Sequence, residues 1–170
     1  MSKNKNSQTT SESAPSDGHH QLYDFEDALL VEGEPVWERM SKVAQLCASL
    51  VEKHFGEKLD FTPNSLAVLD RVVVSGWGEQ GGPDAVPVNV RVTFGAYIGE
   101  ILVRRTPGRW VSSFTDEEPA TVLFLDSDDK MVANVSPFLL VREKFTNMYR
   151  FDLSVAWAAL EQKLGEAGAI

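Results

Sequence analysis

The apolar residues in the centre of the chain recur at the spacing of an α-helix. They fall three or four positions apart and cover more than one side of such a helix. Glu100 and Arg104 fall on a narrower polar stripe. Residues 87–105 are therefore predicted to form a central, buried helix, with Pro87 in a first position that tolerates proline.

The first part of this stretch also fits a β-strand. From Val88 to Phe94 apolar and polar residues alternate, which is the period of a half-buried strand. The helix is the preferred interpretation, because Gly95 and Gly99 stand four positions apart and this spacing has a structural meaning only on a helix. Glycine inside a helix costs about 1 kcal/mol relative to alanine, so the pair predicts that another backbone approaches closely there.

Two further helices are predicted ahead of the central one. The first begins at Glu34-Pro35 and ends at Gly56, because a left-handed glycine commonly follows the last helical residue. The second has Thr62 as its cap and Pro63 as its first residue, and apolar residues follow at helical spacing.

Strands are expected after the central helix. They are predicted at 109–113, 120–126 and 130–135, with the last two joined in a hairpin through Ser127-Asp128-Asp129. A helical stretch from Phe138 should break at 146–150 before a last helix begins. The predicted fold class is α+β, with N-terminal helices and a central buried helix packed on a small antiparallel sheet of about three strands, and a C-terminal helix.

Composition divides the chain into a leader and one domain. With 170 residues and 43% hydrophobic content, it is long enough for one sizeable core. Residues 1–33 are predicted to be a disordered acidic leader, residues 34–165 a single α+β domain and residues 166–170 a flexible C-terminus. Within the leader, residues 22–32 mix apolar and acidic side chains, which is typical either of a strap packed on the domain or of an interaction segment.

Charge and cysteine content narrow the function classes. A net charge of −9 argues against binding to nucleic acid, whose phosphates attract clustered lysine and arginine. Cys47 is the only cysteine, so no intrachain disulfide is expected and a reducing, cytoplasmic location fits. The N-terminus lacks the apolar core of a signal peptide. Charged residues interrupt the central apolar run well short of the roughly 20 residues that span a bilayer, so no membrane insertion is expected.

No cofactor or metal site is predicted. Asp126, Asp128 and Lys130 fall on the first, third and fifth positions of a calcium-binding loop. The cation at the fifth position, with Met131 in place of glycine at the sixth, excludes that type of site. The glycines before the central helix do not form a phosphate-binding motif.

Glu100 is the main candidate for chemistry. Arg104 stands four positions after it, which is the favourable order for an ion pair on a helix, so a structural tie is preferred over a general acid or base. His54 is interpreted as a residue of a helix end or core edge. Because the sequence contains no Ser–His–Asp order and no metal-binding motif, an enzyme is the less favoured class.

Two short motifs are similar to a signature known from a protein family. The sequence Gly-Ala-Tyr-Ile-Gly-Glu at 95–100, followed by Gly108-Arg109-Trp110, resembles a signature of small bacterial proteins with a domain of unknown function. In that family a helix ending in Gly-x-x-x-Gly-acid leads into a strand opened by Gly-x-Trp. The similarity extends in order of elements from Pro35 to Leu164 and implies an α+β architecture, without an activity. Here Thr106-Pro107 stands where a second glycine is expected.

Two functions are therefore expected from the sequence. The first is a non-catalytic protein-binding, accessory or regulatory domain of a soluble bacterial protein. Its contact surface is expected at five residues: Tyr97, Glu100, Arg104, Arg109 and Trp110. The alternative is a small hydrolase or small-molecule-binding protein that uses Glu100 in a pocket beside the hairpin.

Overall fold

The stretch that contains Gly95 and Gly99 is a helix, α4 (Val88–Arg105). It is seen in a computed structural model that describes residues 33–79, 83–113, 115 and 118–170. The alternative of a strand from Val88 to Phe94 is therefore wrong, because the apolar residues bury more than one side of a helix rather than one face of a sheet. Every residue from Thr93 to Leu102 is buried, so α4 is the centre of the fold.

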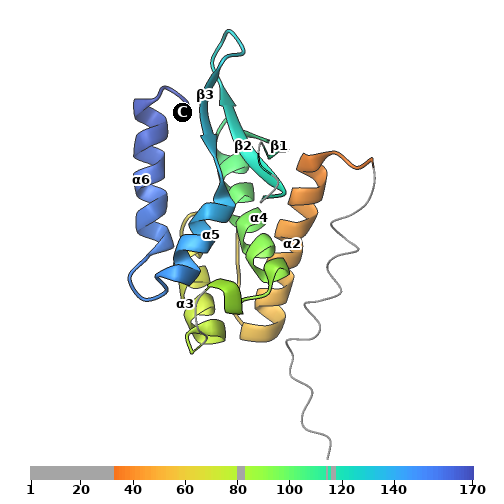
Figure 1. Cartoon of the computed structure of the whole chain (residues 1–170), viewed down its shortest axis with the longest axis vertical. Helices are drawn as coiled ribbons and strands as arrows, with labels where there is room; N and C mark the ends of the chain where they lie inside the picture. Colours follow the sequence, from red (N-terminus) through yellow and green to blue (C-terminus); the bar gives the residue numbers. More distant parts are fainter. Residues whose placement is uncertain (1–32, 80–82, 114, 116–117) are drawn as a thin grey trace, which may run out of the picture.

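In the described part of the chain two helices precede α4, and α2 (Val36–Phe55) packs along it (Figure 1). As predicted, α2 is followed by Gly56 in the left-handed conformation, with φ of 69°. The next helix, α3 (Ser65–Trp77), begins later than predicted. The side chain of Asp60 accepts hydrogen bonds from both the N–H and the hydroxyl of Thr62, so the chain turns there and Thr62 does not cap the helix.

A short connection leads from α3 to α4. It contains the 3-10 helix η2 (Pro83–Ala85). Pro87 then occupies the cap position of α4, with φ of −53° and ψ of 141°, rather than the first helical position that the sequence predicts.

Three strands form an antiparallel sheet in the order β1-β2-β3, as predicted. They are β1 (Arg109–Ser112), β2 (Ala120–Leu125) and β3 (Met131–Val135). Their ends differ from the predicted ends by at most one residue. The carboxylate of Asp126 accepts the N–H of Lys130 at 2.9 Å and thereby closes the hairpin between β2 and β3.

The chain ends in two helices, α5 (Pro137–Thr146) and α6 (Leu153–Glu166), with the predicted break between them. The side chain of Asp152 caps α6 by accepting the N–H of Val155 at 2.9 Å. The predicted flexibility of residues 166–170 stays a prediction, although the side chain of Ala169 is buried. Residues 1–32 of the predicted leader lie outside the described residues.

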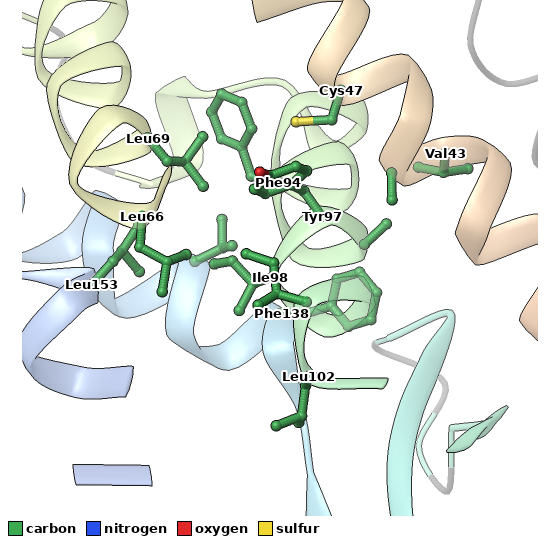
Figure 2. Close-up of a cluster of buried hydrophobic side chains, with 14 of the residues drawn as sticks. Val43, Cys47, Leu66, Leu69, Phe94, Tyr97, Ile98, Leu102, Phe138 and Leu153 are labelled. Carbon is green, nitrogen blue, oxygen red and sulfur yellow. The ribbon is translucent and has the colours of Figure 1, made fainter. Parts of the chain in front are cut away.

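One hydrophobic core joins all the described helices and the sheet around α4, so the predicted α+β class is confirmed. Figure 2 shows part of this core, in which α2, α3, α5 and α6 each send side chains toward α4. The labelled residues are Val43, Cys47, Leu66, Leu69, Phe94, Tyr97, Ile98, Leu102, Phe138 and Leu153.

The two glycines of α4 mark close contacts, but with side chains rather than with another backbone. A Cβ atom added to Gly95 would lie 2.2 Å from Cδ1 of Phe138, on α5. A Cβ atom added to Gly99 would lie 2.1 Å from Cη2 of Trp110, on β1. The close approach predicted from the sequence is therefore present, and aromatic rings occupy the space that the missing Cβ atoms leave.

Candidate functional site

The five residues predicted as a contact surface lie at the end of α4 and the start of β1. Tyr97, Glu100 and Trp110 are buried, and Glu100 is only 6% exposed. Arg104 and Arg109 are exposed. Three of the five side chains are therefore part of the interior and are not presented to a partner, while the two arginines are accessible.

Glu100 is held by three donors from three elements. Its Oε1 atom accepts from Nε of Arg104 at 2.9 Å and from the hydroxyl of Ser41 at 3.2 Å. Its Oε2 atom accepts from the indole N–H of Trp110 at 3.3 Å. The predicted Glu100–Arg104 ion pair is thus confirmed, and the carboxylate ties α2, α4 and β1 together.

Phe61, which the sequence analysis did not single out, belongs to the same cluster. It has a φ of 59°, which is rare for a bulky residue. Its N–H donates to the hydroxyl of Tyr97 at 2.9 Å, and the guanidinium carbon of Arg104 lies 3.9 Å from the centre of its ring. Nothing in the local sequence marks this conformation, because it depends on contacts made by a distant helix.

The hydroxyl of Tyr97 is fully engaged in hydrogen bonds. The Ser65 hydroxyl donates to the carbonyl of Thr62 at 2.6 Å, so Tyr97 is the donor in its own 2.6 Å contact with Ser65. Burial raises the pKa of Tyr97, and the hydrogen bonds to Ser65 and Phe61 only partly oppose this. The Tyr97 phenol is therefore neutral at physiological pH, as suits a core residue.

Cavities open elsewhere on the described part of the chain. Three of them have volumes of about 560, 510 and 240 Å³, and Glu100 lines none of these. A general acid or base must reach its substrate directly or through one water. The geometry of Glu100 therefore suits a structural role better than a catalytic one.

One of these cavities is a groove between the first half of α4 and α5, which we call the α4–α5 groove. It has a volume of about 510 Å³. Half of its ten lining residues are apolar, and two large aliphatic side chains among them face solvent: Val88 is 64% exposed and Leu139 is 51% exposed. The lining residues are Asp84, Val88, Arg91, Val92, Glu118, Pro119, Phe138, Leu139, Arg142 and Thr146.

Two arginines in the groove have no ion-pair partner among the residues that the structure describes. None of the ion pairs within the described residues includes Arg91 or Arg142. The Nε atom of Arg91 is also buried without a hydrogen-bond partner in this part of the chain. Of the two carboxylates in the lining, Glu118 already accepts the hydroxyl of Ser136. The groove therefore combines exposed apolar surface with two arginines that form no ion pair within the described residues.

Sequence reasoning missed the groove because its two sides are far apart in the chain. Arg91 is one of the charged residues that interrupt the central apolar run, and Arg142 falls in a different helix. The exposed Leu139, which stands in the apolar run after Phe138, was the available signal. His54 is exposed in the last turn of α2, where the sequence predicts a helix-end residue.

Other kinds of site are not seen in the described residues. Within them, no group of three or more His, Cys, Asp and Glu side chains is placed to hold a metal ion. None of the described helices is both long enough and apolar enough to cross a bilayer.

A scan against protein-family models, a search of curated proteins and a search of solved structures each found no match. The resemblance carried by residues 95–100 and 108–110 therefore stays a prediction from these motifs alone.

Proposed function

We propose that the protein is a non-catalytic binding protein, an accessory or regulatory domain that recognises a partner protein through the α4–α5 groove. One observation carries this proposal: Arg91 and Arg142, which form no ion pair within the described part of the chain, lie in the same groove as the exposed side chains of Val88 and Leu139. This contact surface replaces the one expected from the sequence, since most of that surface is buried.

The composition of the groove defines the chemistry of the partner. Exposed apolar side chains gain free energy when another apolar surface covers them. Arginine is enriched at the centres of protein interfaces, because its guanidinium group binds carboxylates in a bidentate manner. The buried Nε atom of Arg91 would gain its missing acceptor. The partner is therefore a protein segment that presents apolar side chains flanked by Asp or Glu.

The alternative function, a hydrolase or small-molecule binder built on Glu100, has less support. Its carboxylate already accepts three hydrogen bonds and lines none of the three cavities. A cytoplasmic location remains part of the proposal. It rests on the single cysteine, Cys47, which is buried in the core.

The proposal is tested by comparing groove variants with matched control variants of the tagged full chain. Leu139→Asp and Arg142→Glu alter exposed residues of the groove. Val155→Asp and Arg105→Glu make the same changes at exposed positions outside it. After cross-linking in cells of the native host, captured proteins are identified by mass spectrometry, and unfolding curves establish that all four variants are folded.

We expect one or a few proteins to be captured by the unaltered chain and both control variants, and lost with both groove variants. Capture should also weaken as salt is added, because the contact includes arginine–carboxylate pairs. If the groove variants retain the same proteins, or if the unaltered chain captures none, the proposal is wrong.

A further inference from the structure

A second cavity, which we call the α3–α5 cavity, opens between α3 and the connection from α5 to α6. Its volume is about 560 Å³, which lies within the usual range for small-molecule sites. It shares no lining residue with the α4–α5 groove. The lining residues are Asp70, Arg71, Val74, Ser75, Lys144, Met148, Tyr149, Arg150, Phe151 and Asp152.

A buried ammonium group lines this cavity. The side chain of Lys144 is only 5% exposed, and its Nζ atom lies 2.6 Å from Oδ1 of Asp70. Nζ also donates to the carbonyl oxygen of Phe151 at 2.8 Å. An ammonium group carries three protons, and the described residues provide acceptors for two of them.

The two carboxylates of the cavity are already engaged. Besides Lys144, Asp70 accepts the N–H of Leu153 through Oδ2 at 2.9 Å. Asp152 accepts the N–H of Val155 at the start of α6. Burial raises the pKa of Asp70, against the opposing effects of Lys144 and the N–H of Leu153. The site is thus partly desolvated, and a charge placed there interacts more strongly than it would in water.

The rim adds positive charge that is not used. Arg150 is exposed, and none of the ion pairs in the described part of the chain includes it. The lining holds three cationic side chains and two carboxylates. Arg71 pairs with Glu57 at 3.4 Å and Lys144 pairs with Asp70, so Arg150 is the cation of the lining that pairs with no carboxylate of the described residues.

The rest of the lining is largely apolar. It includes Val74, Met148 and Phe151, together with Ser75 and Tyr149. A ligand that fits must therefore carry one negative charge for Arg150 and the free proton of Lys144, together with an apolar body for this wall. Phosphate matches the cations but leaves the apolar wall uncovered.

We infer that the α3–α5 cavity binds a small organic monocarboxylate with an apolar body. The carboxylate lies between Arg150 and the ammonium group of Lys144, and the apolar body covers Val74, Met148 and Phe151. This site is distinct from the proposed partner contact, because the cavity and the groove share no lining residue.

Benzoate is a suitable probe, because it is a planar monocarboxylate with an apolar ring. Amide signals of the isotopically labelled full chain are followed by NMR during titration with benzoate, with benzamide as the uncharged analogue and inorganic phosphate as the purely polar anion. We expect saturable shifts in the amides of residues 147–153 with benzoate, and much weaker effects with the other two compounds. If benzoate produces no saturable shift there, or if benzamide or phosphate matches it, the inference is wrong.

Substitutions in the cavity test where the carboxylate of benzoate binds. Arg150→Gln removes an exposed arginine at the cavity, and we expect it to weaken benzoate binding by about tenfold, the effect of losing one charge-assisted contact. Arg105→Gln, an exposed arginine at the end of α4, is the matched control and should bind benzoate as the unaltered chain does. Leu139→Asp should also leave benzoate binding unchanged, which separates this site from the groove. Equal binding by Arg150→Gln and the unaltered chain would contradict the inference.

Discussion

The indole ring of Trp110 lies directly over Gly99, in the space that a side chain would otherwise fill. A Cβ atom at Gly99 would be 2.1 Å from Cη2 and 2.3 Å from Cζ2 of that ring. The same indole donates its N–H to Glu100, the next residue of α4, at 3.3 Å. Gly99 therefore provides the space for β1 to pack against α4, and Glu100 fixes the orientation of the ring in that space.

Replacing Gly99 by alanine should destabilise the protein. The added methyl group overlaps the buried Trp110 ring and also lies 2.8 Å from Cγ of Pro137, so neither neighbour can move without disturbing the core. Overpacking of this kind typically costs about 1–3 kcal/mol. The free energy of unfolding, measured by urea denaturation, should fall by this amount despite the higher helix propensity of alanine.

Gly165 provides the matched control for this change. It lies in α6, and an added Cβ atom there would meet nothing within 4 Å. Gly165→Ala should therefore raise the free energy of unfolding by about 0.4–1 kcal/mol through the lower entropy of the unfolded chain. If Gly99→Ala is as stable as Gly165→Ala, the indole does not occupy the space above α4.

The elements that sequence analysis predicts well are those whose patterns are local. The helical period of residues 87–105 and the polar residues that separate the two hairpin strands are both local features of the sequence, and the helix and both strands are confirmed. The Glu100–Arg104 pair is likewise local, because both residues lie on one helix face. The late start of α3 was missed because Asp60 competes for the N–H and hydroxyl of Thr62.

The sites could not be predicted in the same way, because tertiary packing creates them. The groove joins Arg91 to Arg142, and the α3–α5 cavity joins Asp70 to Lys144. In the sequence, nothing distinguishes these four residues from ordinary polar residues of a helix. The positive φ of Phe61 is similar, since only the folded protein brings Tyr97 to its N–H.

A second prediction concerns the tie at Glu100. Glu100→Gln keeps the shape of the side chain but removes the charge that pairs with Arg104. The new amide N–H₂ group also replaces one acceptor oxygen, so it faces a group that is itself a donor, either Arg104 or Trp110. Loss of a buried, charge-assisted hydrogen bond should lower the free energy of unfolding by about 1.5–3 kcal/mol. Urea denaturation measures this loss.

Glu38→Gln is the control for the Glu100 variant. Glu38 also pairs with a base four residues later, Lys42, but this pair lies at the surface. Exposed pairs contribute little because water and salt screen them, so Glu38→Gln should unfold as the unaltered chain does. Equal losses in the two variants would show that Glu100 does not have a special structural role.

A third prediction concerns the thiol of Cys47. It is fully buried in α2, and burial raises the pKa of the thiol well above its usual range. Because thiolates are the reactive form, Cys47 should not react with Ellman's reagent in the folded protein and should react fully in urea.

Ser49 lies on the same helix and is exposed, so Ser49→Cys provides a matching accessible thiol. This thiol should react rapidly with Ellman's reagent in the folded protein. Rapid labelling of Cys47 in the folded chain would show that α2 does not pack on the core as described.

The last prediction uses the pH dependence of stability. Burial raises the pKa of Tyr97 above the ordinary value of 10.0, so the folded protein holds the phenolic proton more tightly than the unfolded chain does. The resulting stabilisation is fully present below pH 10 and is lost as the pH rises through the folded-state pKa. As the pH rises above 10, the free energy of unfolding should therefore fall less steeply for Tyr97→Phe than for the unaltered chain.

At neutral pH, the same variant should be less stable by about 1–2 kcal/mol, because the N–H of Phe61 loses its acceptor. Tyr149→Phe is the control for the loss of a tyrosine, because it removes a phenol at the surface whose hydroxyl donates to the carbonyl of Gly78 at 3.1 Å. Urea denaturation across the alkaline range measures both effects. An alkaline slope that is the same with and without the Tyr97 hydroxyl would show that this phenol is not buried, and the packing of α4 against the segment around Phe61 would then be wrong.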